Sequence, residues 1–186
     1  MKGFESAMYA FNAQLMGVPP GVTDNKSQDI QDIILLQAYS RAVVPQVKKL
    51  NMASKPFSAE VYGEMSTELI DTILQDCNIN SQSVVVDLGS GVGNVVTQSR
   101  IRTACTVFGI EQRELAAHTA RCLLMEVNAR SQMWGSTIAN GMEVEQGDIR
   151  KSEQLRRWLR EADLVICNNL MFDEDRESAL PFLAQL

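Results

Sequence analysis

The fold is decided by one stretch of sequence, VVVDLGSGVGN at residues 84–94. It begins with three consecutive valines, a pattern typical of a strand buried on both faces, as in a parallel sheet. Asp87 and three glycines at alternate positions follow, and glycine allows both a tight turn and a close approach of a ligand to the backbone. Val95 and Val96 continue into a predicted helix that starts at or just after Gly93. The order of strand, glycine turn and helix N-terminus predicts a binding site for a nucleoside cofactor.

The spacing of the glycines indicates which cofactor is bound. A dinucleotide fingerprint has the form G-x-G-x-x-G, whereas residues 89–93 have G-x-G-x-G, with Asp87 two positions before the first glycine. This pattern resembles motif I of class I methyltransferases, which bind S-adenosylmethionine, and a carboxylate suits the ammonium group of that cofactor. A glycine-rich turn alone is a weak signal, because plain strand–helix turns have it too. The acid and the preceding valines favour the cofactor site.

The composition is that of a globular protein of one domain. The chain has 186 residues, of which 45% are hydrophobic and 22% are charged, enough for a real core. Seventeen Lys and Arg against 23 Asp and Glu give a net charge of −6. This charge predicts little affinity of the chain for nucleic acid, although a local basic patch stays possible. No apolar run is long enough to cross a membrane.

Cysteine and histidine give no sign of a metal site. The four cysteines, Cys77, Cys105, Cys122 and Cys167, form no C-x-x-C pair, and we expect them to be small buried hydrophobic residues in a reducing compartment. His118 is the single histidine, so no metal cluster can be built from several histidines. We therefore predict no metal ion.

Helical and extended patterns alternate along the chain. Helices are predicted from Ser27 toward Pro45, from residue 66 or 67 to residue 77, from 95 through 101, across 115–127, and from 152 to 159. Strands are predicted at 84–86, 106–110, 142–146 and 164–167. The alternation predicts a parallel α/β sheet with helices on both faces. The usual order of a methyltransferase sheet would place the strand at 164–167 inside the sheet beside 84–86, and its four apolar residues agree with a strand covered on both faces.

Polar residues follow all four predicted strands, and open α/β sheets bind ligands at the carboxyl ends of their strands. The four are Asp87, Glu111, Asp148 and Asn168. Glu111 can accept hydrogen bonds from both hydroxyls of a ribose; a solvated charge at a strand end is the alternative. Asp148 can accept from an adenine amino group while the backbone N–H of Ile149 donates to the ring. The alternative for Asp148 is the N-cap of a helix.

Five short blocks occur in a fixed order: PFSAEVYGE at 56–64, DLGSGVG at 87–93, GIE at 109–111, GDI at 147–149 and NN at 168–169. Together they resemble the non-SET histone H3 lysine methyltransferases of the disruptor-of-telomeric-silencing family. The resemblance extends from about residue 33 to residue 173. Many methyltransferases share the glycine motif, whereas the first block and the paired asparagines are far more specific.

The resemblance implies a class I, Rossmann-like methyltransferase fold and methyl transfer from S-adenosylmethionine to a lysine of histone H3 in the nucleosome. It also implies a nuclear location. We expect a small helical region with a linker at 1–55 and the cofactor-binding core at 56–186. By motif, the implied cofactor-binding residues are Tyr62, Gly63, Glu64, Met65, Val85, Val86, Asp87, Leu88, Gly89, Ser90, Gly91, Val92, Gly93, Asn94, Glu111, Asp148 and Ile149. Asn168 is implied as the catalytic residue that lines the channel for the target lysine.

The chemistry agrees with these roles. The methyl group of a sulfonium is already activated, so the enzyme mainly aligns an amine with it. The lysine must first lose its proton, and a narrow, dry channel lowers its pKa by desolvation. The sequence offers no strong general base. The side-chain carbonyl of Asn168 can orient the amine but cannot take its proton.

The sequence departs from the family pattern in four ways. Met65 stands where Thr is frequent, and Asn94 stands where Gln is common. A methyltransferase sheet usually has seven strands, whereas four are found here, and the family's basic nucleosome-binding extension is not visible. We therefore expect the C-terminal strands to be missing, and we expect these 186 residues alone to methylate histone weakly or not at all and to be prone to self-association.

Three other functions stay open. The chain could methylate another protein or a small molecule, although the PFSAEVYGE block argues against this. It could be a non-catalytic interaction module that keeps the cofactor fold, which the missing strands would favour. An NAD-dependent dehydrogenase is a distant alternative because of Asp87 and the glycine spacing.

Overall fold

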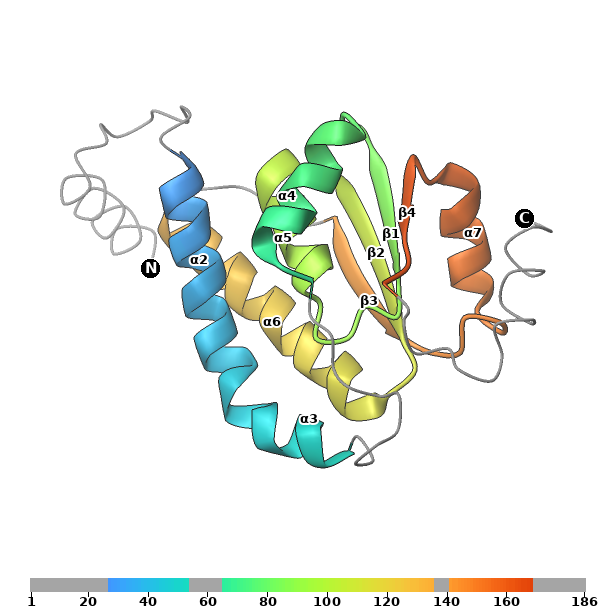
Figure 1. Ribbon diagram of the computed structural model, residues 1–186, viewed down its shortest axis with the longest axis horizontal. Coiled ribbons are helices and arrows are strands. Elements are labelled where there is room, and N and C mark those ends of the chain that lie inside the picture. Colours follow the sequence, from blue (N-terminus) through green and yellow to red (C-terminus); the bar gives the residue numbers. More distant parts are fainter. Residues whose placement is uncertain (1–26, 54–64, 136–140, 169–186) are drawn as a thin grey trace.

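The computed structural model describes residues 27–53, 65–135 and 141–168. Its centre is a four-stranded sheet in the order β3-β2-β1-β4, in which all neighbouring strands are parallel (Figure 1). The strands are β1 (Val84–Leu88), β2 (Thr106–Glu111), β3 (Met142–Gln146) and β4 (Leu164–Ile166). The predicted parallel α/β sheet is confirmed, and so is the pairing of β4 with β1.

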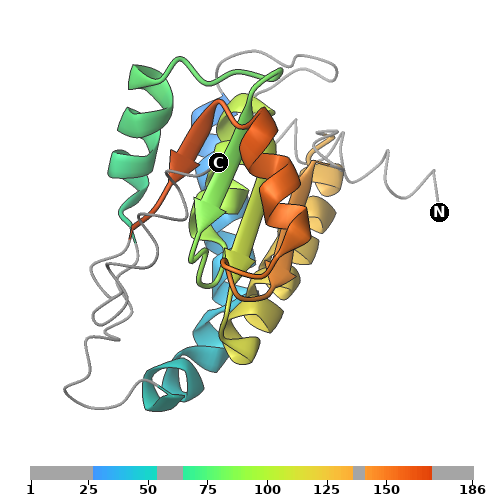
Figure 2. The same cartoon turned by 90° about the vertical axis from the view of Figure 1, so that its right-hand side faces the viewer.

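Helices cover both faces of the sheet, as the sequence predicts. They are α2 (Ser27–Ala42), the 3₁₀ helix η1 (Val44–Gln46), α3 (Val47–Ala53), α4 (Thr67–Asp76), α5 (Asn94–Thr103), α6 (Glu114–Met133) and α7 (Glu153–Glu161). Helices α4, α5 and α6 lie on one face and α7 on the other (Figures 1 and 2). Helix α2 forms an outer layer on α5 and α6. None of the described helices is both long and apolar enough to span a membrane.

The core follows the alternation of side chains along each strand. Val85 and Val107 face α4, α5 and α6, where they pack with Ile70. Their neighbours Val86 and Phe108 face α7. The ring of Phe108 also stacks on that of Trp158, with 5.8 Å between the centroids. Both faces of β1 are therefore buried, which explains its run of valines.

The helices begin where capping chemistry predicts. Ser66 caps α4 by accepting a hydrogen bond from the N–H of Leu69 at 3.2 Å, and Ser152 caps α7 by accepting from the N–H of Leu155 at 2.9 Å. Helix α2 ends three residues before Pro45, which has no N–H to continue an α-helix.

The structure corrects two expectations from the sequence. Cys77 and Cys167 are exposed rather than buried, because Cys77 follows the last turn of α4 and Cys167 lies beyond the end of β4 at Ile166. Strand β4 is not covered on both faces: Val165 is 40% exposed. The reason is that α7 packs over β1 and β2, and that among the described residues no helix covers this side of β4. The expectation that C-terminal strands are missing stays a prediction, because residues 169–186 lie outside the described residues.

Candidate functional site

The site lies where the direction of the strand order reverses. The chain runs from β1 to β2 and β3 on one side, then crosses to β4 on the other side of β1. In an open α/β sheet the crevice at the carboxyl ends of such strands is the usual ligand site. Asp87 stands in register between Gly109 of β2 and Ile166 of β4. Glu111 and Asn168 each follow two residues later, so the structure brings Asp87, Glu111 and Asn168 to one edge.

The glycine turn is folded back onto the end of β2. Gly89, Gly91 and Gly93 have φ values of 78°, 55° and 86°, a region that side chains other than glycine rarely adopt. The N–H groups of Gly89 and Ser90 both donate to the carbonyl of Ile110 at 2.9 Å. The N–H of Gly91 donates to the Glu111 carboxylate, also at 2.9 Å. The turn is therefore fixed in place by β2 before any ligand binds.

Gly109 allows the glycine turn to lie close to β2, a role that was not predicted for it. A Cβ at Gly109 would lie 2.8 Å from the Cβ of Ser90 and 2.8 Å from a methyl group of Val96. Both distances are too short for real carbon contacts. The available signal was a glycine inside a buried strand, which marks a place where another segment comes very close.

Asp87 is the group at this edge that most requires a ligand. Its side chain is buried, at 3% exposure, and its Oδ2 atom has no hydrogen-bond partner among the described residues. Burial, and then the negative charge of Glu111, raise the pKa of Asp87 from 3.8 to about 7. A buried acceptor without a donor is costly. A cationic donor such as an ammonium group would both satisfy this oxygen and restore its charge.

Glu111 has partners but keeps acceptor capacity. Its Oε1 atom accepts hydrogen bonds from the backbone N–H of Arg113 at 2.8 Å and from the Arg113 guanidinium at 3.3 Å. Its Oε2 atom accepts from Gly91. Because a carboxylate oxygen has two lone pairs, Oε2 can accept one more hydrogen bond, for example from a ribose hydroxyl. The alternative of a solvated charge is wrong, since the residue is only 6% exposed.

Asp148 lies at the same edge, but both of its carboxylate oxygens already accept hydrogen bonds from Arg150. Its Oδ1 accepts from the Arg150 backbone N–H at 2.9 Å, and its Oδ2 accepts from the Arg150 guanidinium at 3.0 Å. These hydrogen bonds to Arg150 lower the pKa of Asp148. The alternative role as a helix cap is wrong, because Ser152 caps α7. Ile149 packs beside the cluster that contains Leu155 and offers an apolar wall.

The other predicted residues that the structure describes lie in three places: a groove, the end of β4, and β1 with its turn. Met65 and Asn94, both half-buried, line a groove of about 760 Å³ between α2, α4 and α5. Asn168 is exposed at the end of β4. The preceding thiol, Cys167, has a pKa raised by desolvation and by the charge of Asp87. The remaining predicted backbone contacts, at 85–93, lie in β1 and the turn. Tyr62, Gly63 and Glu64 lie outside the described residues.

No group of three or more His, Cys, Asp or Glu side chains that could hold a metal ion occurs within 27–53, 65–135 and 141–168. The chemistry of this edge is that of two buried carboxylates and a rigid backbone turn. Such a set suits a ligand with a positive charge next to a sugar.

Comparison with known proteins gives a family match over most of the chain. The family model described as "Histone methylation protein DOT1" matches residues 39–184. A histone-lysine N-methyltransferase, H3 lysine-79 specific, of Chaetomium globosum is 35% identical over 183 residues, which cover 94% of this chain and 35% of the relative. The protein of the same name from Emericella nidulans is 39% identical over 140 residues, 75% of this chain and 27% of the relative. The chain thus spans about a third of the length of these relatives.

Among solved structures, an RNA methyltransferase from Salinibacter ruber in complex with S-adenosyl-L-homocysteine has a TM-score of 0.46 and 23% identity. The match covers 55% of this chain and 58% of that one. A likeness of this size carries no argument about function.

Proposed function

The chain belongs to the family of the histone methylation protein DOT1, and from this premise we propose that it transfers methyl groups from S-adenosylmethionine to a lysine of histone H3 in the nucleosome. One observation supports the proposal most. The buried carboxylate of Asp87 has an oxygen without a donor at the edge where a cofactor of this kind would place its ammonium group. The residues at this edge therefore fit the ammonium group of S-adenosylmethionine.

We assign the cofactor contacts by chemistry. Asp87 would pair with the methionyl ammonium, Glu111 would accept from the ribose, and Ile149 would flank the adenine. Asp148 could accept from the adenine amino group only if it shared its oxygens with Arg150. The cofactor, when bound, supplies a methyl group that its sulfonium has already activated. The remaining contacts would come from the backbone of residues 85–94 and from the segment 62–65.

The rest of the reaction depends on how the amine is held. Asn168 would accept a hydrogen bond from the lysine amine through its side-chain carbonyl and so orient the nitrogen lone pair. Exclusion of water around the lysine would favour its neutral form. We place the protein in the nucleus beside its substrate, and we assign 1–55 to a helical region and 56–186 to the cofactor-binding core. With a net charge of −6, we expect histone contacts rather than attraction to DNA to hold it on the nucleosome.

The test uses the full chain. Isothermal titration with S-adenosylmethionine measures binding, and labelled cofactor with recombinant nucleosomes measures transfer to histone H3. Asn168→Ala is the matched variant, with normal cofactor binding and reduced transfer. Absence of cofactor binding would overturn the proposal. Binding with transfer only to other acceptors would indicate another substrate and would contradict the assignment to histone H3. Binding without any transfer agrees both with an interaction module and with the inactivity expected of these residues alone.

A further inference from the structure

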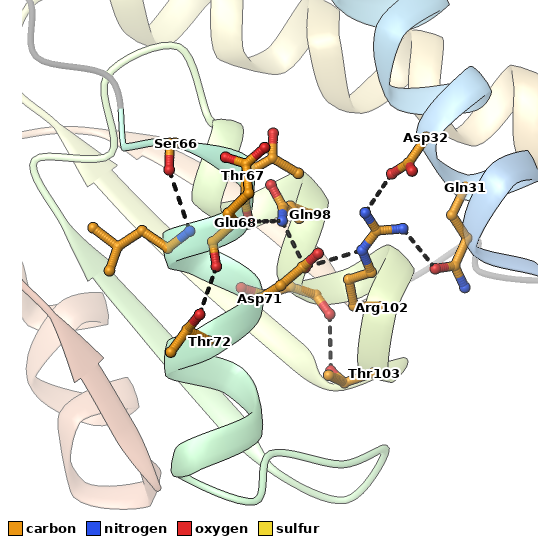
Figure 3. A network of polar contacts seen from close by, with 12 residues as sticks. Gln31, Asp32, Ser66, Thr67, Glu68, Asp71, Thr72, Gln98, Arg102 and Thr103 are labelled. Carbon is orange, nitrogen blue, oxygen red and sulfur yellow. Dashed lines mark hydrogen bonds and ion pairs between the residues drawn. The ribbon is translucent and has the colours of Figure 1, made fainter.

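A buried glutamine joins two helices beside the candidate cofactor site. Gln98 of α5 is 4% exposed. Its side-chain amide donates to the backbone carbonyl of Thr67 at 2.8 Å and to the Asp71 carboxylate at 2.7 Å, both on α4 (Figure 3). Two donors directed at two acceptors of a neighbouring helix fix both the distance and the rotation between the helices.

Gln98 connects the start of α4 to the first half of α5, and both places lie next to predicted cofactor-binding residues. Thr67 is the first residue of α4 and follows Met65 by two positions. On the other side, Gln98 lies one helical turn after Asn94, the first residue of α5. The hydroxyl of Thr97, the residue before Gln98, donates to the carbonyl of Gly93 at 2.9 Å. Gln98 therefore links the first residue of α4, two positions after Met65, to the helix that begins at the glycine turn.

The same contacts continue to the outer helix. Arg102, one turn further along α5, pairs with Asp71 at 3.0 Å and donates to Gln31 at 2.9 Å and to Asp32, both on α2 (Figure 3). Asp71 is thus held from two directions, by Gln98 and by Arg102. Because it cannot turn away from Gln98, the link from α4 to α5 is rigid.

We propose that Gln98 is a positioning residue for S-adenosylmethionine: it touches neither cofactor nor substrate, but it holds the start of α4, next to Met65, to the helix that begins at the glycine turn. The inference rests on the proposed function, since it concerns the affinity for the same cofactor. A residue with this role affects cofactor binding and leaves the methyl-transfer step alone. A residue that only stabilises the fold affects unfolding, but it changes neither cofactor binding nor the methyl-transfer step.

The test replaces Gln98 by leucine, which has a similar size and no donor. Both acceptors keep other donors, because Asp71 still pairs with Arg102 and the Thr67 carbonyl lies within the first turn of a helix, so the variant is expected to fold. We expect the Kd for S-adenosylmethionine to rise about tenfold. The turnover number at saturating cofactor should stay within about twofold of the wild type.

The matched control is Ile70→Val, a change in a buried residue of α4, the helix to which Gln98 donates, that removes no hydrogen bond. It lowers the melting temperature but should leave the Kd unchanged. If Gln98→Leu lowers the melting temperature as the control does and binds the cofactor like the wild type, Gln98 is a structural strut and the inference is wrong. If the wild type itself does not bind the cofactor, the proposed function fails and the inference fails with it.

Should the leucine variant not fold, Gln98→Asn is the second variant. It keeps the amide but is one methylene too short to reach both acceptors. Its Kd for S-adenosylmethionine should rise less than that of the leucine variant, and its turnover number should stay constant.

Discussion

Two groups of charged side chains, near opposite ends of α5, are paired in very different ways. In the first, called here the Arg102 clamp (Gln31, Asp32, Asp71, Gln98 and Arg102), the guanidinium donates to three side chains of two other helices, and Asp71 accepts from two donors. In the second, the carboxyl edge of Asp87 and Glu111, two carboxylates lie near each other. There one oxygen of Asp87 has no donor among the described residues.

The pKa values show what this difference means. Burial lowers the pKa of Arg102, but its hydrogen bonds to Asp32 and Asp71 outweigh that effect and the pKa is raised overall, so the clamp stabilises the charge. The pKa of Asp87 is raised to about 7 by burial and by Glu111, so the edge destabilises the charge. Charges that hold a fold together are paired within it. A charge that the fold leaves unpaired is available to a ligand.

The largest effect is expected from breaking the clamp. Arg102→Met removes the only cation that the described contacts give to Asp71, whose side chain is only 18% exposed. Removing one partner of a buried ion pair leaves an uncompensated charge, so the free energy of unfolding should fall by about 3 kcal/mol. Denaturant unfolding measures it. The control is Arg157→Met, a change at an exposed position of α7 that should alter stability by less than about 0.5 kcal/mol. Equal effects of the two substitutions would mean that the clamp contributes nothing.

The same substitution at the two sites should have opposite consequences for stability. Asp87→Asn removes a charge that the fold disfavours, so the free energy of unfolding at pH 8 should be unchanged or higher, whereas Asp71→Asn removes a paired charge and should lower it by about 1–2 kcal/mol. Asp87→Asn should also weaken S-adenosylmethionine binding by about 2 kcal/mol, or roughly thirtyfold. Calorimetry and unfolding curves on the two variants test this. Loss of stability in Asp87→Asn would show that the carboxylate has a structural partner.

The titration of Asp87 predicts opposite pH trends for folding and for binding. Since its pKa is 3.8 unfolded and about 7 folded, the folded protein holds a proton between these values that the unfolded chain has released. The stability from Asp87 is therefore fully present below about pH 3.8 and is lost as the pH rises through about 7. Binding of an ammonium requires the carboxylate, so the Kd should fall about fivefold from pH 6 to pH 7, below the range in which an α-amino group loses its proton. The Asp87→Asn variant should lack both trends, and a flat binding profile in the wild type would contradict the raised pKa.

The sequence predicted the edge better than the clamp, for a physical reason. Strand β1, its glycine turn and Glu111 follow local rules, since apolar runs, backbone freedom and strand ends are all visible within a few residues. The clamp joins Gln31, Asp71 and Arg102, which lie far apart in the chain. Each looks like an ordinary polar residue on a helix surface. Only the packing of α2 and α4 against α5 makes them neighbours, and no local pattern encodes that packing.

Details within correctly predicted elements were also hidden. Strand β4 was expected to be covered on both faces, but a run of apolar residues does not specify how far a helix extends, and α7 leaves Val165 exposed. The commitment of Asp148 to Arg150 depends on side-chain rotamers, which the sequence does not fix. Gly109 was visible as a glycine in a strand, but the segment that approaches it was not.

The smallest predicted effect comes from Gly89, where the conformation of the turn and the space for a ligand are two separate reasons for a glycine. Gly89 has φ of +78°, and a Cβ there would meet no atom within 4 Å, so Gly89→Ala should lower the free energy of unfolding by only about 1 kcal/mol, through backbone strain alone. The open space beside it is where the cofactor would approach, so binding of S-adenosylmethionine should also weaken. Gly147→Ala is the control: a Cβ there would lie 2.9 Å from the movable end of the Glu145 side chain, without a positive φ, and should change stability by less than about 0.5 kcal/mol. If Gly89→Ala loses stability but binds the cofactor as tightly as the wild type, the turn requires glycine only for its own conformation. The ligand would then have to meet the edge elsewhere, through Asp87 and Glu111.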